Sequence, residues 1–103
     1  MFLSPSAYRE GDTIMAVLVK ILNRGMSLEK YDEIAPRLVP ELKRQAGFHI
    51  HLCNATDDGL VVHEVWDSGE QQQAWFDRYV RPNIPPEARP EIEVVALHNV
   101  EAK

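Results

Sequence analysis

Three histidines in this sequence stand where they could act together. His49 and His51 are two positions apart in a segment that alternates apolar and polar residues, so on a β-strand both would point to the same face. A hairpin turning at residues 54–59 would bring His63 onto the neighbouring strand, and three imidazoles there would make a zinc or transition-metal site. The turn leaves the register open, and a slip of one residue would move His63 to the other face. The polar face of a half-exposed strand is therefore the simpler interpretation.

A histidine and a glutamate are the candidates for acid–base catalysis. A neutral imidazole accepts and donates protons near pH 7, so His51 could transfer a proton or orient a carbonyl group. The alternative for His51 is a hydrogen bond to backbone or interface groups. Glu64 precedes Trp66 by two positions, and Lys20 interrupts the strand that is expected to pair with it. A Lys20–Glu64 ion pair would be structural, whereas a Glu64 carboxylate facing a cavity would be a candidate general base.

The segments that must position these residues follow the order β-α-β-β-α-β. Apolar or alternating runs predict strands at Ile14 to Leu22, Phe48 to Cys53, Leu60 to Trp66 and Glu91 to Asn99. An apolar stripe predicts a helix over residues 28–42, in which Pro36 and Pro40 should cause a kink or two short helices. A second helix is expected from about Ser68 to Val80, with Asp67 or Ser68 as its N-cap.

Right-handed crossovers turn this order into an α+β, ferredoxin-like βαββαβ sandwich, in which a four-stranded antiparallel sheet carries both helices on one face. One domain is expected over residues 14–103, after a flexible N-terminal extension of residues 1–13. The first and third strands look apolar on both faces, so the uncovered face needs a partner. A second copy of the sheet is the simplest partner, and we predict a homodimer through the sheet faces. In that dimer, His51 of one chain could approach His98 of the other.

The overall composition is that of an ordinary globular domain and disfavours several functions. The chain has 103 residues, of which 45% are hydrophobic and 26% charged. Its formal net charge of −5 argues against nucleic-acid binding, which needs clustered cations. The single Cys53 cannot form an intramolecular disulfide, and no apolar run approaches the roughly 20 residues of a membrane span. We therefore expect a cytoplasmic protein with no nucleic-acid or membrane partner.

Several segments resemble the dimeric α/β-barrel superfamily, in particular its antibiotic-biosynthesis-monooxygenase-like branch. They are Ala16-Val17-Leu18-Val19, Tyr31 in the first helix, Gly47-Phe48-His49-Ile50-His51, the junction Val65-Trp66-Asp67-Ser68, and Leu97-His98-Asn99. The resemblance spans residues 15–100 and implies the same fold and a dimer. Its members include oxygenases, cyclases, decarboxylases, haem proteins and proteins without a known role, so it implies the fold more strongly than any one activity.

The resemblance also implies a ligand pocket between the helices and the sheet. Tyr31, Trp66 and Trp75 would then contact a small apolar or aromatic substrate, together with His98, while His51 and Glu64 would be catalytic. The first reaction that it implies is oxygenation without a metal, flavin or other cofactor, in which a substrate enolate or phenolate passes an electron to dioxygen. The alternative is a non-catalytic dimeric module that binds a ligand or only assembles.

One sub-branch that degrades haem can be compared residue by residue. Its members resemble this chain at Trp66, and their second-helix tryptophan falls on Trp75. They also need an iron-ligating histidine a short distance further on and an asparagine in the first strand. Residues 81–86 contain no histidine, and Ile14 to Leu22 contains no asparagine. We therefore expect neither haem nor another cofactor.

Overall fold

A computed structural model describes residues 9–10, 13–14 and 16–103. The strands are β1 Arg9–Glu10, β2 Thr13–Ile14, β3 Val17–Arg24, β4 Phe48–Thr56, β5 Gly59–Trp66 and β6 Glu91–Ala96. The helices are α1 Leu28–Leu42, α2 Gly69–Trp75, the π-helix η2 Phe76–Val80 and the 3₁₀-helix η3 Arg81–Asn83. The short strands β1 and β2 pair with each other. Most of the extension that we predict over residues 1–13 lies outside the described residues.

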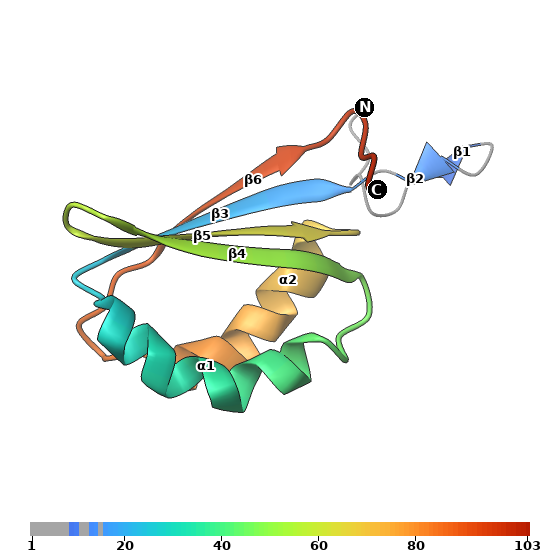
Figure 1. Cartoon of the computed structure of the whole chain (residues 1–103). Coiled ribbons are helices and arrows are strands. Elements are labelled where there is room, and N and C mark those ends of the chain that lie inside the picture. The colour runs from blue at the N-terminus through green and yellow to red at the C-terminus, as the bar shows by residue number, and fades with distance from the viewer. Residues whose placement is uncertain (1–8, 11–12, 15) are drawn as a thin grey trace.

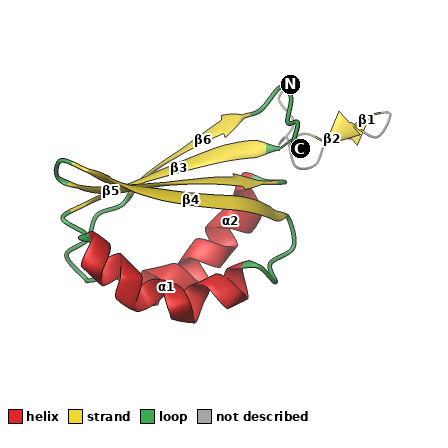
Figure 2. Ribbon diagram, viewed as in Figure 1, coloured by secondary structure: helices red, strands yellow, loops and turns green. Residues whose placement is uncertain are grey.

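The main sheet has four antiparallel strands in the order β4-β5-β3-β6. Both helices lie on one face of this sheet (Figure 1; Figure 2), and the other face carries no element of the described chain. This arrangement confirms the predicted α+β, ferredoxin-like fold. No helix of the described residues is long and apolar enough to cross a membrane.

Strand β3 begins and ends later than the sequence pattern predicts. Its buried and more exposed positions alternate, with Val19, Ile21 and Asn23 on the helix face. It ends at a turn where Gly25, with a φ of 82°, donates its backbone N–H to Asp58 at 2.7 Å. Because this turn contact comes from the β4–β5 hairpin, the pattern of β3 alone could not locate the end of the strand.

Helix α1 runs unbroken through Pro36 and Pro40, so of the two predicted outcomes, a kink or two short helices, the second is wrong. Both prolines are exposed and lie one turn apart. The backbone carbonyls that lose their N–H partners are therefore on the solvent side, where water can bind them. Ser27 caps the helix by accepting a hydrogen bond from the backbone N–H of Lys30 at 3.0 Å.

The second predicted helix is present but changes its winding halfway. Ser68 is the N-cap and accepts a hydrogen bond from the backbone N–H of Gln71 at 3.0 Å. The chain then passes from α2 into η2, whose wider winding is often found at functional sites. Trp75 and Phe76 stand at this change, and both side chains are buried.

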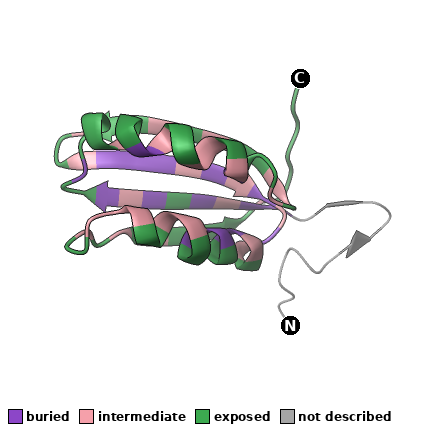
Figure 3. Cartoon of the chain, turned by 90° about the horizontal axis from the view of Figure 1, so that it is seen from below, coloured by how far each residue is buried: buried purple, intermediate pink, exposed green. Residues whose placement is uncertain are grey.

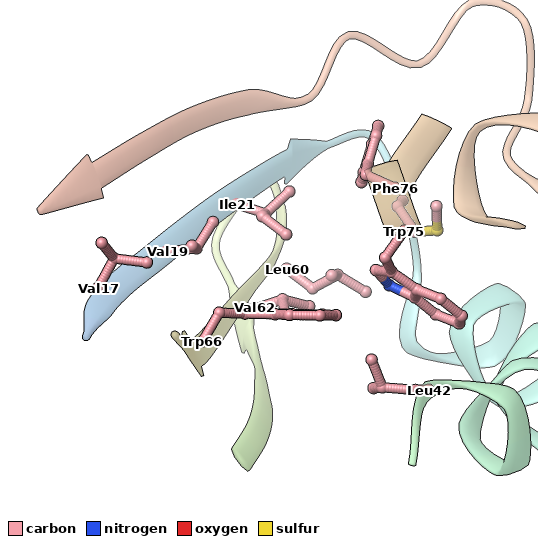
Figure 4. Packing of buried hydrophobic residues seen from close by; sticks show 10 residues of the cluster. Val17, Val19, Ile21, Leu42, Leu60, Val62, Trp66, Trp75 and Phe76 are labelled. Carbon is pink, nitrogen blue, oxygen red and sulfur yellow. The ribbon is translucent and has the colours of Figure 1, made fainter. Parts of the chain in front are cut away.

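The core lies between the two central strands and the helices. Figure 3 shows that the buried positions gather in these strands, β3 and β5. Figure 4 shows side chains of both strands projecting toward Leu42, Trp75 and Phe76 of the helices. Trp66 is completely buried and meets the Phe48 ring edge-on, with their centroids 5.5 Å apart. This aromatic packing closes the end of the core where β5 leads into α2.

Candidate functional site

Four side chains from three elements form one hydrogen-bonded chain under the sheet. Tyr31 of α1 contacts His51 of β4, with its hydroxyl 2.6 Å from Nε2. His51 Nδ1 lies 2.7 Å from Glu64 Oε2, and Trp66 Nε1 donates to Glu64 Oε1 at 2.9 Å. The strand register brings this about, because His51 is directly opposite Glu64 and Trp66 lies two residues further on the same face. The sequence singled out all four residues, and the structure brings them together.

The donors and acceptors in this hydrogen-bonded chain of four side chains can be assigned from their chemistry. The indole N–H of Trp66 can only donate, so Glu64 accepts there. If the second carboxylate oxygen also accepts, His51 carries its proton on Nδ1. Nε2 then holds a free electron pair, which accepts the hydroxyl proton of Tyr31. Glu64 is only 2% exposed, so its hydrogen bond with the imidazole is shielded from water.

Tyr31 keeps its proton over the physiological pH range. Burial raises the pKa of its hydroxyl to about 12, and the nearby Cys53 and Glu64 add to the increase. Burial also raises the pKa of the neighbouring Cys53 thiol, although a hydrogen bond with Tyr31 acts in the opposite direction. Tyr31 is therefore a neutral donor that covers the basic nitrogen of His51.

A cavity lies between the helices and the sheet, and the hydrogen-bonded chain reaches its wall. The cavity volume is about 80 Å³, which is room for roughly half a dozen water molecules. Tyr31, His51, Glu64 and Asn23 are its polar lining, and the remaining lining is apolar: Ile21, Met26, Ile34, Ala35, Leu38, Val39, Leu42, Leu60, Val62, Trp75, Phe76, Val80 and Ile84. An apolar hollow with a few polar groups is the usual form of a small-molecule site.

Asn23 is a cavity residue that the sequence analysis missed. It is 8% exposed, lies on the buried face of β3 and contributes to the cavity wall. Within the described part of the chain, its side-chain amide has no hydrogen-bond partner. Gly59 allows the two strands to approach here, since a Cβ atom on Gly59 would collide with the Asn23 carbonyl oxygen. The alternation of β3, continued two residues beyond Ile21, is the signal that could have found it.

The presence of Asn23 in β3 also removes one of the two arguments against haem binding, namely that the first strand contains no asparagine. The first strand reaches Arg24, so it does contain an asparagine. The other ground holds, because residues 81–86 provide no histidine for an iron.

The three-histidine metal set, which was the less favoured interpretation of the sequence, does not form among the described residues. A β-bulge between Phe48 and Ile50 interrupts the regular alternation that was expected to place His49 and His51 on one face. His49 lies 2.7 Å from Asp67 at the surface, and His63 lies on the opposite face of the sheet from His51. Among the described residues, no group of three or more histidine, cysteine, aspartate or glutamate side chains could hold a metal ion.

The predicted Lys20–Glu64 ion pair is also wrong. The partner of Glu64 on β3 is Val19, whereas Lys20 is paired with His63. Since neighbouring positions of a strand point to opposite faces, Lys20 lies on the outer face and Glu64 on the helix face. The register between β3 and β5 differs by one position from the register that would pair Lys20 with Glu64, and this difference separates the two charges.

The other predicted substrate contacts have different positions. Trp75 lines the cavity and stacks on Tyr79, with their ring centroids 4.8 Å apart. Trp66 lies behind Glu64 and is absent from the cavity lining, so it supports the carboxylate instead. His98 is exposed and follows the end of β6, which stops at Ala96 and not at Asn99 as predicted.

Comparisons with known proteins identify the fold. No family model and no curated protein matches the chain. A conserved protein from Methanosarcina mazei Go1 superposes with a TM-score of 0.59 at 15% identity, over 79% of this chain and 91% of that protein. SnoaB from Streptomyces nogalater, a cofactor-independent oxygenase, superposes with a TM-score of 0.56 at 14% identity, over 88% of this chain and 100% of SnoaB. A variant of SnoaB gives a TM-score of 0.62 at 13% identity over the same shares.

Proposed function

We propose that this protein binds a small, mostly apolar or aromatic molecule in the cavity and oxygenates it without a cofactor. The observation that carries the proposal is the Tyr31–His51–Glu64 chain, which ends at the wall of an apolar cavity. It provides a base with a buried carboxylate behind it, as proton abstraction requires. The similarity in fold to SnoaB, a cofactor-independent oxygenase, supports the same class of reaction.

The first step would be ionisation of a substrate phenol or enol. Nε2 of His51 is the only nitrogen of this ring that can take the proton, because Nδ1 is held by Glu64. The proton reaches Nε2 directly, if the substrate hydroxyl replaces Tyr31, or through the Tyr31 hydroxyl. The carboxylate of Glu64 stabilises the imidazolium that forms. A positioned base of this kind contributes about 10²–10⁴-fold to a rate.

The second step would be the reaction with dioxygen. The phenolate passes one electron to dioxygen, and the phenoxyl radical and superoxide combine to form a carbon–oxygen bond. The imidazolium returns its proton to the resulting peroxide, the O–O bond breaks, and the carbon loses its hydrogen as water leaves. A phenol and one dioxygen thus give a quinone and one water, and the substrate supplies all the electrons. No reductant or redox cofactor is needed for this balance.

We also propose that two copies associate through the outer face of the sheet. This face carries exposed apolar side chains at Ile50, Leu52 and Val95, which are 47%, 55% and 44% exposed. An apolar patch of this kind is unfavourable in water, and a second copy of the same face would cover it. The approach of His51 to the partner's sheet edge near His98 belongs to this proposal.

The test is dioxygen uptake with a panel of quinols and naphthols. We expect His51→Ala to lower the rate by about 10²-fold or more, because the base is lost. His49→Ala is the matched control, since His49 is on the same strand and bonds a carboxylate outside the cavity. Use of ¹⁸O₂ should place one labelled oxygen in each product molecule. Equal uptake by the wild type and His51→Ala would overturn the role of His51.

A non-catalytic ligand-binding module is the second candidate. The cavity volume favours a module that only assembles, because about 80 Å³ is well below the roughly 300 Å³ of common ligand pockets. Binding of a naphthol without any dioxygen uptake above the buffer rate would support the ligand-binding module.

A further inference from the structure

A groove lies beside the cavity, at the end of the molecule where the chain passes from α1 into β4 (Figure 1). Its volume is about 270 Å³, which is much larger than that of the cavity and close to the roughly 300 Å³ of common ligand pockets. The groove is lined by the last turn of α1 and the start of β4: Val39, Leu42, Lys43, Phe48, His49, Ile50 and His51. The reaction proposed above does not use it.

The groove and the cavity share part of their walls but differ in their polar groups. His51 belongs to both linings, together with two apolar residues of α1. Tyr31 and Glu64 line the cavity and not the groove, whereas Lys43 and Phe48 line the groove and not the cavity. A molecule in the groove would therefore meet a different set of side chains from a molecule in the cavity.

Most of the groove wall is apolar and is held in place by the core. Val39, Leu42, Phe48 and Ile50 are four of its seven lining residues. Leu42 is buried in the core, and Phe48 packs against the buried ring of Trp66. A ligand gains free energy here in proportion to the apolar surface that it removes from water, so it needs an apolar body.

The only permanent charge in the groove lining is the ammonium group of Lys43. Among the described residues, this ammonium has no ion-pair or hydrogen-bond partner. The neighbouring cation is already used, because Arg44 pairs with Glu41 at 2.7 Å. His49 likewise lies 2.7 Å from Asp67. Lys43 is therefore the charge that is left for a ligand to neutralise.

The end of helix α1 does not compete for the Lys43 ammonium. Carbonyl groups at the C-terminus of a helix often lack a partner and then attract a cation. Here the carbonyls of Val39, Glu41 and Leu42 accept hydrogen bonds from the backbone N–H groups of residues 43–45, at 3.0 to 3.1 Å. The helix end satisfies its own acceptors, and the ammonium is available to a group that arrives from solution.

We propose that the groove is a binding site for a small monocarboxylate with an apolar body. The carboxylate pairs with Lys43, and the apolar body lies against Val39, Leu42 and Phe48. The lining supplies one cation and no carboxylate, so a single negative charge is matched and a second would not be. This site goes beyond the proposed oxygenation and does not rest on it, because its ligand needs no hydroxyl and no dioxygen.

Two compounds of the same shape, 1-naphthylacetate and 1-naphthylacetamide, test the charge requirement. Neither has a hydroxyl group, so neither can enter the proposed reaction. In ¹H–¹⁵N NMR titrations of the full chain, the backbone signals of Lys43, Phe48 and His49 should shift. Those of Met26 and Ile84, which line the cavity and not the groove, should not. We expect the acetate to bind about 3- to 5-fold more tightly than the acetamide at low salt, and this advantage to shrink as salt is added.

Lys43→Gln should remove the advantage of the acetate while leaving the affinity for the acetamide within about 2-fold. Arg44→Gln is the matched control, because it removes a cation one position away that is outside the groove lining and changes the net charge equally. Lys43 and Arg44 are both exposed, so both variants should fold. Equal affinities of the two compounds for the wild type, equal effects of the two variants, shifts centred on Met26 and Ile84, or no binding at millimolar concentration would overturn the proposal.

Dioxygen uptake with quinols and naphthols is measured separately on the same proteins. A protein that binds the acetate as expected but consumes no dioxygen would keep the groove site and lose the oxygenase function. A protein that consumes dioxygen but does not prefer the acetate would show the reverse.

Discussion

Replacing Glu64 with glutamine should switch the proton of His51 from one nitrogen to the other. The indole N–H of Trp66 can only donate, so it holds the carbonyl oxygen of the new amide at its own position. The amide NH₂ must then face His51 Nδ1, 2.7 Å away in the wild type. Because NH₂ is a donor, Nδ1 has to accept and the imidazole proton moves to Nε2. The nitrogen that faces Tyr31 is then no longer a base.

The Glu64→Gln substitution should affect the reaction rate strongly and the free energy of unfolding only moderately. Loss of the general base should lower the rate of a proton-abstracting reaction by about 10²–10⁴-fold. The fold should survive, because hydrogen bonds to a charged acceptor contribute about 1.5–3 kcal/mol and neutral ones about 0.5–1.5 kcal/mol. We therefore expect Glu64→Gln to lower the free energy of unfolding by about 1–2 kcal/mol.

Long-range ¹H–¹⁵N NMR spectra of the histidine rings report the tautomer directly, and they need no substrate. Dioxygen uptake and urea unfolding on the same samples give the rate and the stability. Glu87→Gln is the control, because Glu87 is exposed in the segment between η3 and β6. If His51 keeps its proton on Nδ1 in the Glu64→Gln protein, our assignment of the hydrogen-bonded chain is refuted.

Two further predictions concern the association and the pH dependence of stability. Leu52→Lys places a charge on the outer sheet face and should convert a dimer to a monomer of 11.8 kDa in ultracentrifugation. The control Leu28→Lys, on helix α1 with 46% exposure, should leave the dimer intact. A wild-type protein that is already monomeric at micromolar concentration would contradict this prediction. The raised pKa of Tyr31 means that the folded protein holds this proton more tightly than the unfolded chain, so its stabilisation is complete below pH 10.0 and is lost as the pH rises through about 12. Tyr31→Phe should flatten the decline of unfolding free energy over that range in urea titrations, and an unchanged slope would argue against the buried hydroxyl as its cause.

The residue pattern was sufficient to predict the fold and to single out the four residues of the hydrogen-bonded chain. Apolar runs and turn residues are local signals, and they predicted the element order and an N-cap at Asp67 or Ser68, of which Ser68 is the one observed. His51 and Glu64 were singled out as a base and a carboxylate on two neighbouring strands, and the hairpin does bring them together. These features depend on short stretches of chain that fold much as their own residues favour.

The errors at β3, Lys20 and His49 come from contacts between distant parts of the chain. The end of β3, and with it Asn23, depends on a hydrogen bond from Gly25 to Asp58. The partner of Lys20 depends on the register between two strands, which a single residue can change. The bulge at His49 accommodates one extra residue, and no sequence pattern marked it. Tertiary structure decided each of these points.

The bulge at His49 has a consequence for how copies of this protein can meet. Strand β4 is at one margin of the sheet, where unpaired N–H and C=O groups would otherwise form a continuous template for an incoming strand. The extra residue interrupts that row near its beginning. At the opposite margin, β6 is short and carries Glu91 and Glu93, whose charges discourage edge-to-edge growth. Edge-to-edge growth is thus opposed at both margins, and the outer sheet face with its exposed Ile50, Leu52 and Val95 is left as the surface for the proposed dimer.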